Sequence, residues 1–147
     1  MGFIKKVLHA PRDVIRAVRE NCGAALYRRM VFRKKIASIR ERGAARVVFL
    51  VMEPAMWKYA SFHDELKKSR LFEPLVVSAM NPGTCPTEES LLAAQKRIGE
   101  FCERNGYRFV EGYDSVAKKW IDLKSLKPDL VFYAQPYRGA VYDAWYP

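Results

Sequence analysis

The sequence predicts an α/β protein: a Rossmann-like parallel sheet preceded by a basic amphipathic helical arm. From Arg46 onward, short apolar runs alternate with segments of helical periodicity in the order strand, helix, strand, helix, strand, short helix, strand. This order is typical of parallel strands joined by right-handed crossovers. Before Arg46 the periodicity is helical and the charge is strongly basic. The chain of 147 residues is long enough for one ordinary domain with a sizeable core.

The net charge of +10 lies entirely in the first 46 residues. Residues 1–46 carry 13 basic and three acidic side chains, whereas residues 47–147 carry 13 of each. We therefore divide the chain into a basic arm, residues 1–45, and a neutral Rossmann-like body, residues 46–147. The concentrated positive charge of the arm indicates that this part of the protein meets an anionic surface.

The first half of the arm is amphipathic at helical spacing. Pro11 is expected to begin a helix, and Gly23 is expected to interrupt it, which would make residues 24–41 a separate second helix. The apolar side chains that share one sector are Phe3, Ile4, Val7, Leu8, Val14, Ile15, Val18, Cys22 and Leu26. The cations outside that sector, our candidates for membrane contact, are Lys5, Lys6, Arg12, Arg16 and Arg19.

Three interpretations of the arm stay open at this point. A basic amphipathic helix can lie on an anionic membrane surface, or it can pack its apolar face on the body or on a partner. Nucleic-acid binding is disfavoured because no recognition motif accompanies the basic face. No apolar stretch approaches the length of a spanning helix and no signal peptide is seen, and the three unpaired cysteines are typical of reduced thiols. We expect a cytoplasmic protein that is peripheral at the inner face of the membrane.

The body is expected to contain four strands, at residues 46–52, 72–80, 107–110 and 130–134. Helices are expected at 55–69 and 87–105, with a short helix or turn around 120–126. The second helix has the clearest signals, because Thr87 can cap it and Asn105-Gly106 offers a left-handed stop. The open edge of such a sheet could pair with a second copy, so a homodimer is possible.

Open parallel sheets bind ligands at the carboxyl ends of their strands. The glycine-rich turns of dinucleotide and P-loop sites are absent after the first strand, so those ligands are disfavoured. No cofactor and no metal is expected, and no catalytic residue is assigned. The candidate binding residues that follow the strands are Glu53, Trp57, Lys58, Gln135, Tyr137 and Arg138.

Each of these side chains also has a structural interpretation. Glu53 could instead face the positive end of the following helix, and Trp57 could belong to the core. His63 is expected to be solvent-facing or partly buried rather than a catalytic base.

Several segments of the body together resemble a known family. They are residues 47–59 with the strand-Trp-Lys-Tyr pattern, 72–77, 106–107, 112–114, 127–133 with Lys-Pro-Asp, and 135–137 with Gln-Pro-Tyr. Over residues 46–140 the chain resembles the N-terminal Rossmann-like domain of bacterial CDP-glycerol glycerophosphotransferase-related proteins.

The resemblance implies half of a GT-B fold, the acceptor-side half of a transferase of teichoic-acid-type cell-surface polymer synthesis. In that family the donor site and the catalytic histidines belong to a C-terminal domain, which has no counterpart here. The chain alone is therefore expected to be inactive, with that catalytic domain and a lipid-linked or polymer acceptor as partners. The alternative is a stand-alone α/β binding module, without catalysis, for a protein partner or a small anionic ligand.

Overall fold

A computed structural model of the chain describes residues 12–135 and 141–145. Of the predicted site residues, Lys5, Lys6, Tyr137 and Arg138 lie outside the described residues. The chain divides into two compact units, residues 1–41 and residues 42–147, and each is described by itself.

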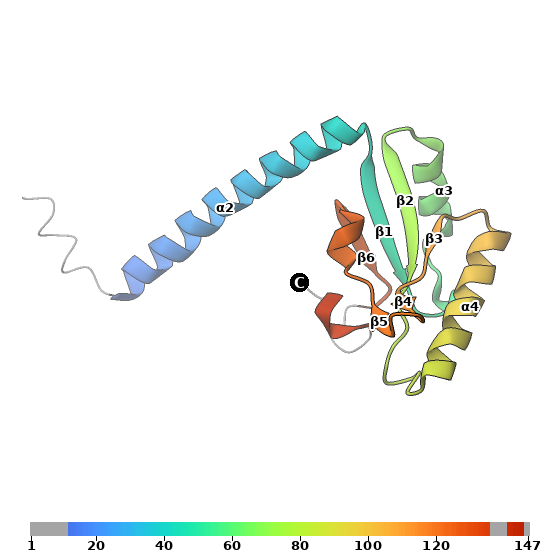
Figure 1. The fold of residues 1–147 in the computed structure, drawn as a ribbon. Helices are drawn as coiled ribbons and strands as arrows, with labels where there is room; N and C mark the ends of the chain where they lie inside the picture. The colour runs from blue at the N-terminus through green and yellow to red at the C-terminus, as the bar shows by residue number, and fades with distance from the viewer. Residues whose placement is uncertain (1–11, 136–140, 146–147) are drawn as a thin grey trace, which may run out of the picture. The chain divides into compact units, whose positions relative to one another are not determined.

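In the first unit the structure describes the helix α2, which runs from Arg12 and ends at Arg42 in the second unit (Figure 1). The expected break at Gly23 is wrong, because the helix passes through it. A single glycine costs a helix only about 1 kcal/mol, which its neighbours can offset. Leu26 and Phe32 are 62% and 68% exposed on this helix. Among the described residues, no helix is long and apolar enough to cross a membrane.

The second unit is an α/β domain with a central parallel sheet of four strands (Figure 1). The strand order is β3-β2-β1-β6, and the bounds are Ala45–Val51 for β1, Phe72–Ser78 for β2, Phe109–Val110 for β3 and Leu130–Tyr133 for β6. Every neighbouring pair is parallel. The predicted fold class, a Rossmann-like half-fold preceded by a helical arm, is confirmed.

Both faces of the sheet are covered, and alternate residues of β1 face the two layers. Helices α3 (Ala60–Lys68) and α4 (Glu88–Arg104) cover one face, where Phe49 and Val76 meet Ile98. The short 3-10 helices Leu123–Leu126 and Asp143–Trp145 lie over the other face, where Leu50 packs in the same cluster as Trp145. Burial on both faces explains why the sequence of β1 is a continuous run of apolar residues after Arg46.

The helices differ in how closely they match the bounds predicted from the sequence. The predicted helix 55–69 is split, because Pro54–Met56 forms a 3-10 turn and α3 begins only at Ala60. Helix α4 is as predicted: the Thr87 hydroxyl accepts the Ser90 N–H, and Gly106 has the left-handed φ of +64° after the helix.

The antiparallel hairpin of β4 (Tyr113–Asp114) and β5 (Lys119–Trp120) was not predicted, nor was the 3-10 helix Asp143–Trp145. Asp114 Oδ1 accepts the backbone N–H groups of Val116 and Ala117 and so shapes the turn of the hairpin. Trp120, expected to begin a short helix, lies in β5 instead. Strands of two residues carry too little periodicity to be recognised in a sequence.

The Lys-Pro-Asp segment has a clear structural role at the beginning of the sheet. Asp129 Oδ2 accepts the Arg46 backbone N–H at 2.8 Å and also binds the Arg42 guanidinium. The Asp129 N–H in turn donates to the Arg46 carbonyl at 2.9 Å. These bonds hold the start of β6 against the start of β1.

Gly112 is predicted to be intolerant of any side chain. A Cβ there would lie 1.9 Å from the Ser78 carbonyl oxygen and 2.8 Å from the Trp145 ring. Because the first of these atoms is backbone, Gly112→Ala should lower the free energy of unfolding by about 3 kcal/mol or more, measured by urea denaturation. Gly23→Ala is the control, since its Cβ meets nothing within 4 Å. Equal stability of the two variants would contradict the prediction.

Candidate functional site

The carboxyl ends of the strands carry the predicted site, and Glu53 lies there directly after β1. Its carboxylate makes an ion pair with Arg97 of α4, with an N–O distance of 3.3 Å. It makes no side-chain cap bond to the following 3-10 turn. Both partners are exposed, so the pair contributes little to stability and can exchange for another ligand.

Trp57 lies in an aromatic cluster of the core layer beneath α3 and α4. Its ring contacts Phe49 edge-on at 5.6 Å and Tyr107 at 5.4 Å between centroids. His63 and Phe101 complete its surroundings at about the same distances. The indole therefore fixes the turn after β1 against the core, as the structural interpretation expected, and is only partly accessible to a ligand.

The remaining described candidates, Lys58 and Gln135, lie at the ends of β1 and β6. Lys58 is exposed beside Trp57, and Gln135 is half-buried after β6. Tyr59 joins these two strand ends, because its hydroxyl donates to the Tyr133 carbonyl at 3.1 Å. The structure thus brings the ends of β1 and β6 together. That residues 137 and 138 contribute to ligand binding at this edge stays a prediction.

A buried polar network that sequence reasoning missed closes the middle of this edge. The Ser78 hydroxyl donates to Gln95 Oε1 at 2.8 Å and accepts the Gly112 N–H at 2.8 Å. The Gln95 amide donates to the Tyr113 carbonyl and accepts the Tyr113 N–H. Since these groups satisfy one another, none of them needs a ligand as a hydrogen-bond partner.

His63 corrects a prediction, because its side chain is 1% exposed rather than solvent-facing or partly buried. Its ring lies 4.1 Å from that of Tyr107 and 5.5 Å from that of Phe49. Burial lowers the pKa of His63, and the nearby Asp64 carboxylate only partly opposes this effect. A signal was present in the sequence, since Tyr59 and Leu66 lie four residues before and three residues after His63, on the same helical face.

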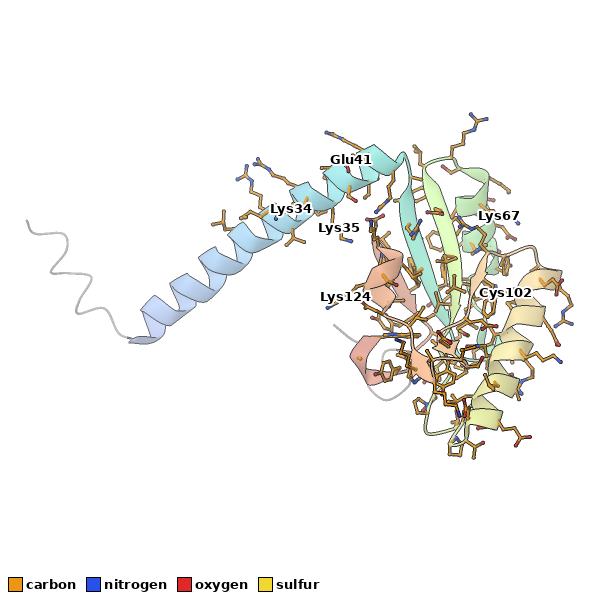
Figure 2. The ribbon with its side chains drawn as sticks, in the orientation of Figure 1. Lys34, Lys35, Glu41, Lys67, Cys102 and Lys124 are labelled. Atoms are coloured by element: carbon orange, nitrogen blue, oxygen red, sulfur yellow. The ribbon has the colours of Figure 1, made fainter. Side chains whose placement is uncertain are left out.

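Two other groups in this layer are kept neutral by their surroundings. Burial raises the pKa of the Cys102 thiol to about 12, so this cysteine packs as an apolar side chain and is not a nucleophile. Burial likewise raises the pKa of Tyr107. Figure 2 shows Cys102 on α4 and Lys67 on α3.

Two of the cavities on the described part of the body have polar or charged linings. One, of about 500 Å³, lies along α4 and β3 and is lined by acidic side chains that include Glu100 and Glu111. The other, of about 210 Å³, lies between α3, the start of β2 and the turn before β3. Within residues 12–135 and 141–145, no three potential metal ligands cluster together.

Comparisons with family models, with curated proteins and with solved structures found no match to this chain.

The burial of His63 predicts a pH dependence of stability. Its pKa is below the ordinary 6.5 in the folded protein, so the unfolded chain binds more protons between the two values. Stability is therefore fully present above about pH 6.5 and is lost as the pH falls toward the folded-state pKa. The groups facing His63 are Asp64 and Lys67 on its helix, Tyr107 beside it, and Glu73 and Arg108 around the cavity.

The comparison is between the wild type and His63→Phe in urea denaturation from pH 5 to 8. The phenyl ring preserves the aromatic packing but does not titrate. The stability of the His63→Phe variant should therefore not show the extra decrease below pH 6.5. If the free energy of unfolding depends on pH in the same way for both proteins, His63 is not the group responsible.

Proposed function

We propose that this chain is the acceptor-side, Rossmann-like half of a membrane-associated transferase of cell-surface polymer synthesis, similar to CDP-glycerol glycerophosphotransferases. In this proposal the arm binds the anionic inner face of the membrane. The edge formed by Glu53, Lys58 and Gln135 faces the acceptor. Catalysis and donor binding then belong to a separate domain.

The observation that carries the proposal is the character of the arm. Helix α2 exposes Leu26, Met30 and Phe32, and the cations Arg33 and Lys34 are exposed on the same segment. Large apolar side chains among cations are typical of helices that lie at a lipid interface. A charge of +10 on the first 46 residues adds electrostatic attraction to anionic lipids.

Two features of the body also support the proposal. Two of the segments that carry the family resemblance, residues 47–59 and 127–133, contain most of β1 with its following turn and strand β6, and these two strands lie side by side in the sheet. The strand order β3-β2-β1-β6 matches half of a doubly wound sheet. Glu53 and Lys58 follow β1 at the edge where such sheets bind their ligands.

The membrane contact is tested by sedimentation with vesicles of phosphatidylglycerol and phosphatidylcholine. The intact chain should sediment with them at low salt and not with phosphatidylcholine alone. Each basic residue near the surface contributes about 1 kcal/mol, so Arg33→Gln with Lys34→Gln should weaken binding roughly thirtyfold.

The matched control carries Lys118→Gln with Lys119→Gln, which removes two exposed charges from the β4–β5 hairpin. It should bind vesicles like the wild type. Equal loss in both double variants would indicate attraction by net charge alone, and no sedimentation at low salt would disprove the membrane role. Steeply salt-dependent binding to DNA without lipid preference would favour the nucleic-acid interpretation.

The transferase role is tested with radiolabelled CDP-glycerol. The chain alone should not transfer glycerol phosphate, whereas addition of a catalytic C-terminal half from the family should restore transfer to a glycerol-phosphate polymer. Glu53→Gln should then reduce transfer, while Lys96→Gln on the exposed side of α4 should not. Absence of transfer both by the chain alone and after addition of the C-terminal half would count against the proposal.

A second function is favoured by the hydrogen bonds in the middle of the carboxyl edge. Because Ser78, Gln95 and the Gly112 N–H are bonded to one another there, they offer no group for catalysis, as expected of a binding module. Such a module would bind a protein partner or a small anionic ligand. Failure of the transfer experiment together with retained ligand binding would support it.

A further inference from the structure

The smaller cavity lies at the amino ends of the strands, opposite the predicted acceptor edge. Its walls come from the last turns of α3, the first three residues of β2 and the turn between α4 and β3. The volume of about 210 Å³ is sufficient for a small oxyanion with a short substituent. The polar and charged side chains that line it are His63, Lys67, Glu73 and Arg108.

His63 is the anomalous group in this cavity. Both of its ring nitrogens are buried without a hydrogen-bond partner, and the nearest Asp64 oxygen is 3.8 Å from Nδ1, too far for a bond. Leaving a buried polar group unpaired costs about 1–3 kcal/mol, so native proteins rarely do so without a water or a ligand nearby. His63 lines the cavity, so its ring lies next to any occupant, while both of its nitrogens are covered by protein.

The cations around the cavity indicate the charge of that occupant. The Lys67 ammonium reaches across to the Gly106 carbonyl at 2.8 Å, and the Arg108 side chain is 65% exposed. Glu73 is the one lining carboxylate, and it is already paired with Arg108 and with Arg46. Burial would raise the pKa of Glu73, but the hydrogen bonds from these two arginines outweigh it and lower the pKa, so Glu73 stays ionised.

The local charge is therefore positive even after Glu73 is counted. Lys67 and Arg108 oppose the one lining carboxylate, and Glu73 is also paired with Arg46 from outside the cavity lining. A guanidinium has five N–H donors, so Arg108 can keep Glu73 and still bind a second anion. Donors from α3 and from the residue before β3 thus surround one space, as a tetrahedral anion with several acceptor oxygens requires.

We propose that this cavity binds a phosphate group, held by Lys67 and Arg108 beside the buried ring of His63. A soluble phosphate monoester and a lipid headgroup present the same phosphate group, so the chemistry of recognition is the same for both. The proposal does not depend on the arm or on the transferase role, because every group involved lies within residues 46–108.

The first arm of the test uses the full-length chain with glycerol 3-phosphate and no lipid. The Cε1–H proton signal of His63 is followed by NMR, and it is assigned with His63→Phe because the chain has two histidines. Phosphate binding should shift this signal and move the titration of His63 to higher pH, since the anion stabilises the imidazolium. Binding should correspondingly tighten as the pH falls.

Lys67→Gln and Arg108→Gln should each weaken phosphate binding about tenfold, the loss of one charge-assisted hydrogen bond. The control is Lys118→Gln, an exposed cation of the distant hairpin, which should leave binding unchanged. In the second arm, vesicles containing phosphatidic acid replace glycerol 3-phosphate.

A His63 shift with glycerol 3-phosphate that both variants weaken supports a soluble ligand. A shift that needs phosphatidic acid and is weakened by both variants supports a lipid headgroup. No shift with either probe, or a shift that survives both substitutions, overturns the proposal. Vesicle sedimentation through the arm can succeed or fail independently of these results, so this site and the membrane role are tested separately.

Discussion

The burial of β1 on both faces is the constraint on which the rest of the body depends. Val47 to Val51 are at most 3% exposed, so each face of this strand must be covered by a separate layer. Helices α3 and α4 supply one layer, and the segments around Leu123 and Trp145 supply the other. With β2 and β6 paired on its two sides, β1 has no free edge, and its partners have little freedom of register.

The two ends of the sheet are organised by different interactions. At the carboxyl end, neutral groups of Ser78, Gln95 and the Gly112 backbone satisfy one another, which requires the absence of a side chain at residue 112. At the amino end the bonds are ionic: Asp129 binds Arg42 and the Arg46 N–H, and Glu73 binds Arg46 and Arg108. Charge is thus concentrated where the cavity of His63 opens.

Arg46 illustrates how one residue serves several of these contacts. Its backbone is paired with Asp129, while its guanidinium reaches Glu73 on β2 at 2.8 Å and the Leu126 carbonyl at 2.5 Å. It therefore ties the starts of three neighbouring segments together. The arm leads into this junction, since α2 ends at Arg42 and β1 begins at Ala45. Any ligand or surface that binds the cations here acts on groups that also hold the sheet.

The sequence alone was sufficient for the fold class, the four parallel strands and the Thr87 cap, because apolar periodicity and capping depend on residues close together in the chain. The basic charge of the arm could also be counted directly from the sequence. Only the tertiary structure decided that His63 is buried, that Gly112 meets a backbone carbonyl, and that Glu53 pairs with Arg97. These properties depend on which distant segment packs against each residue, and an isolated stretch of sequence carries no record of that partner.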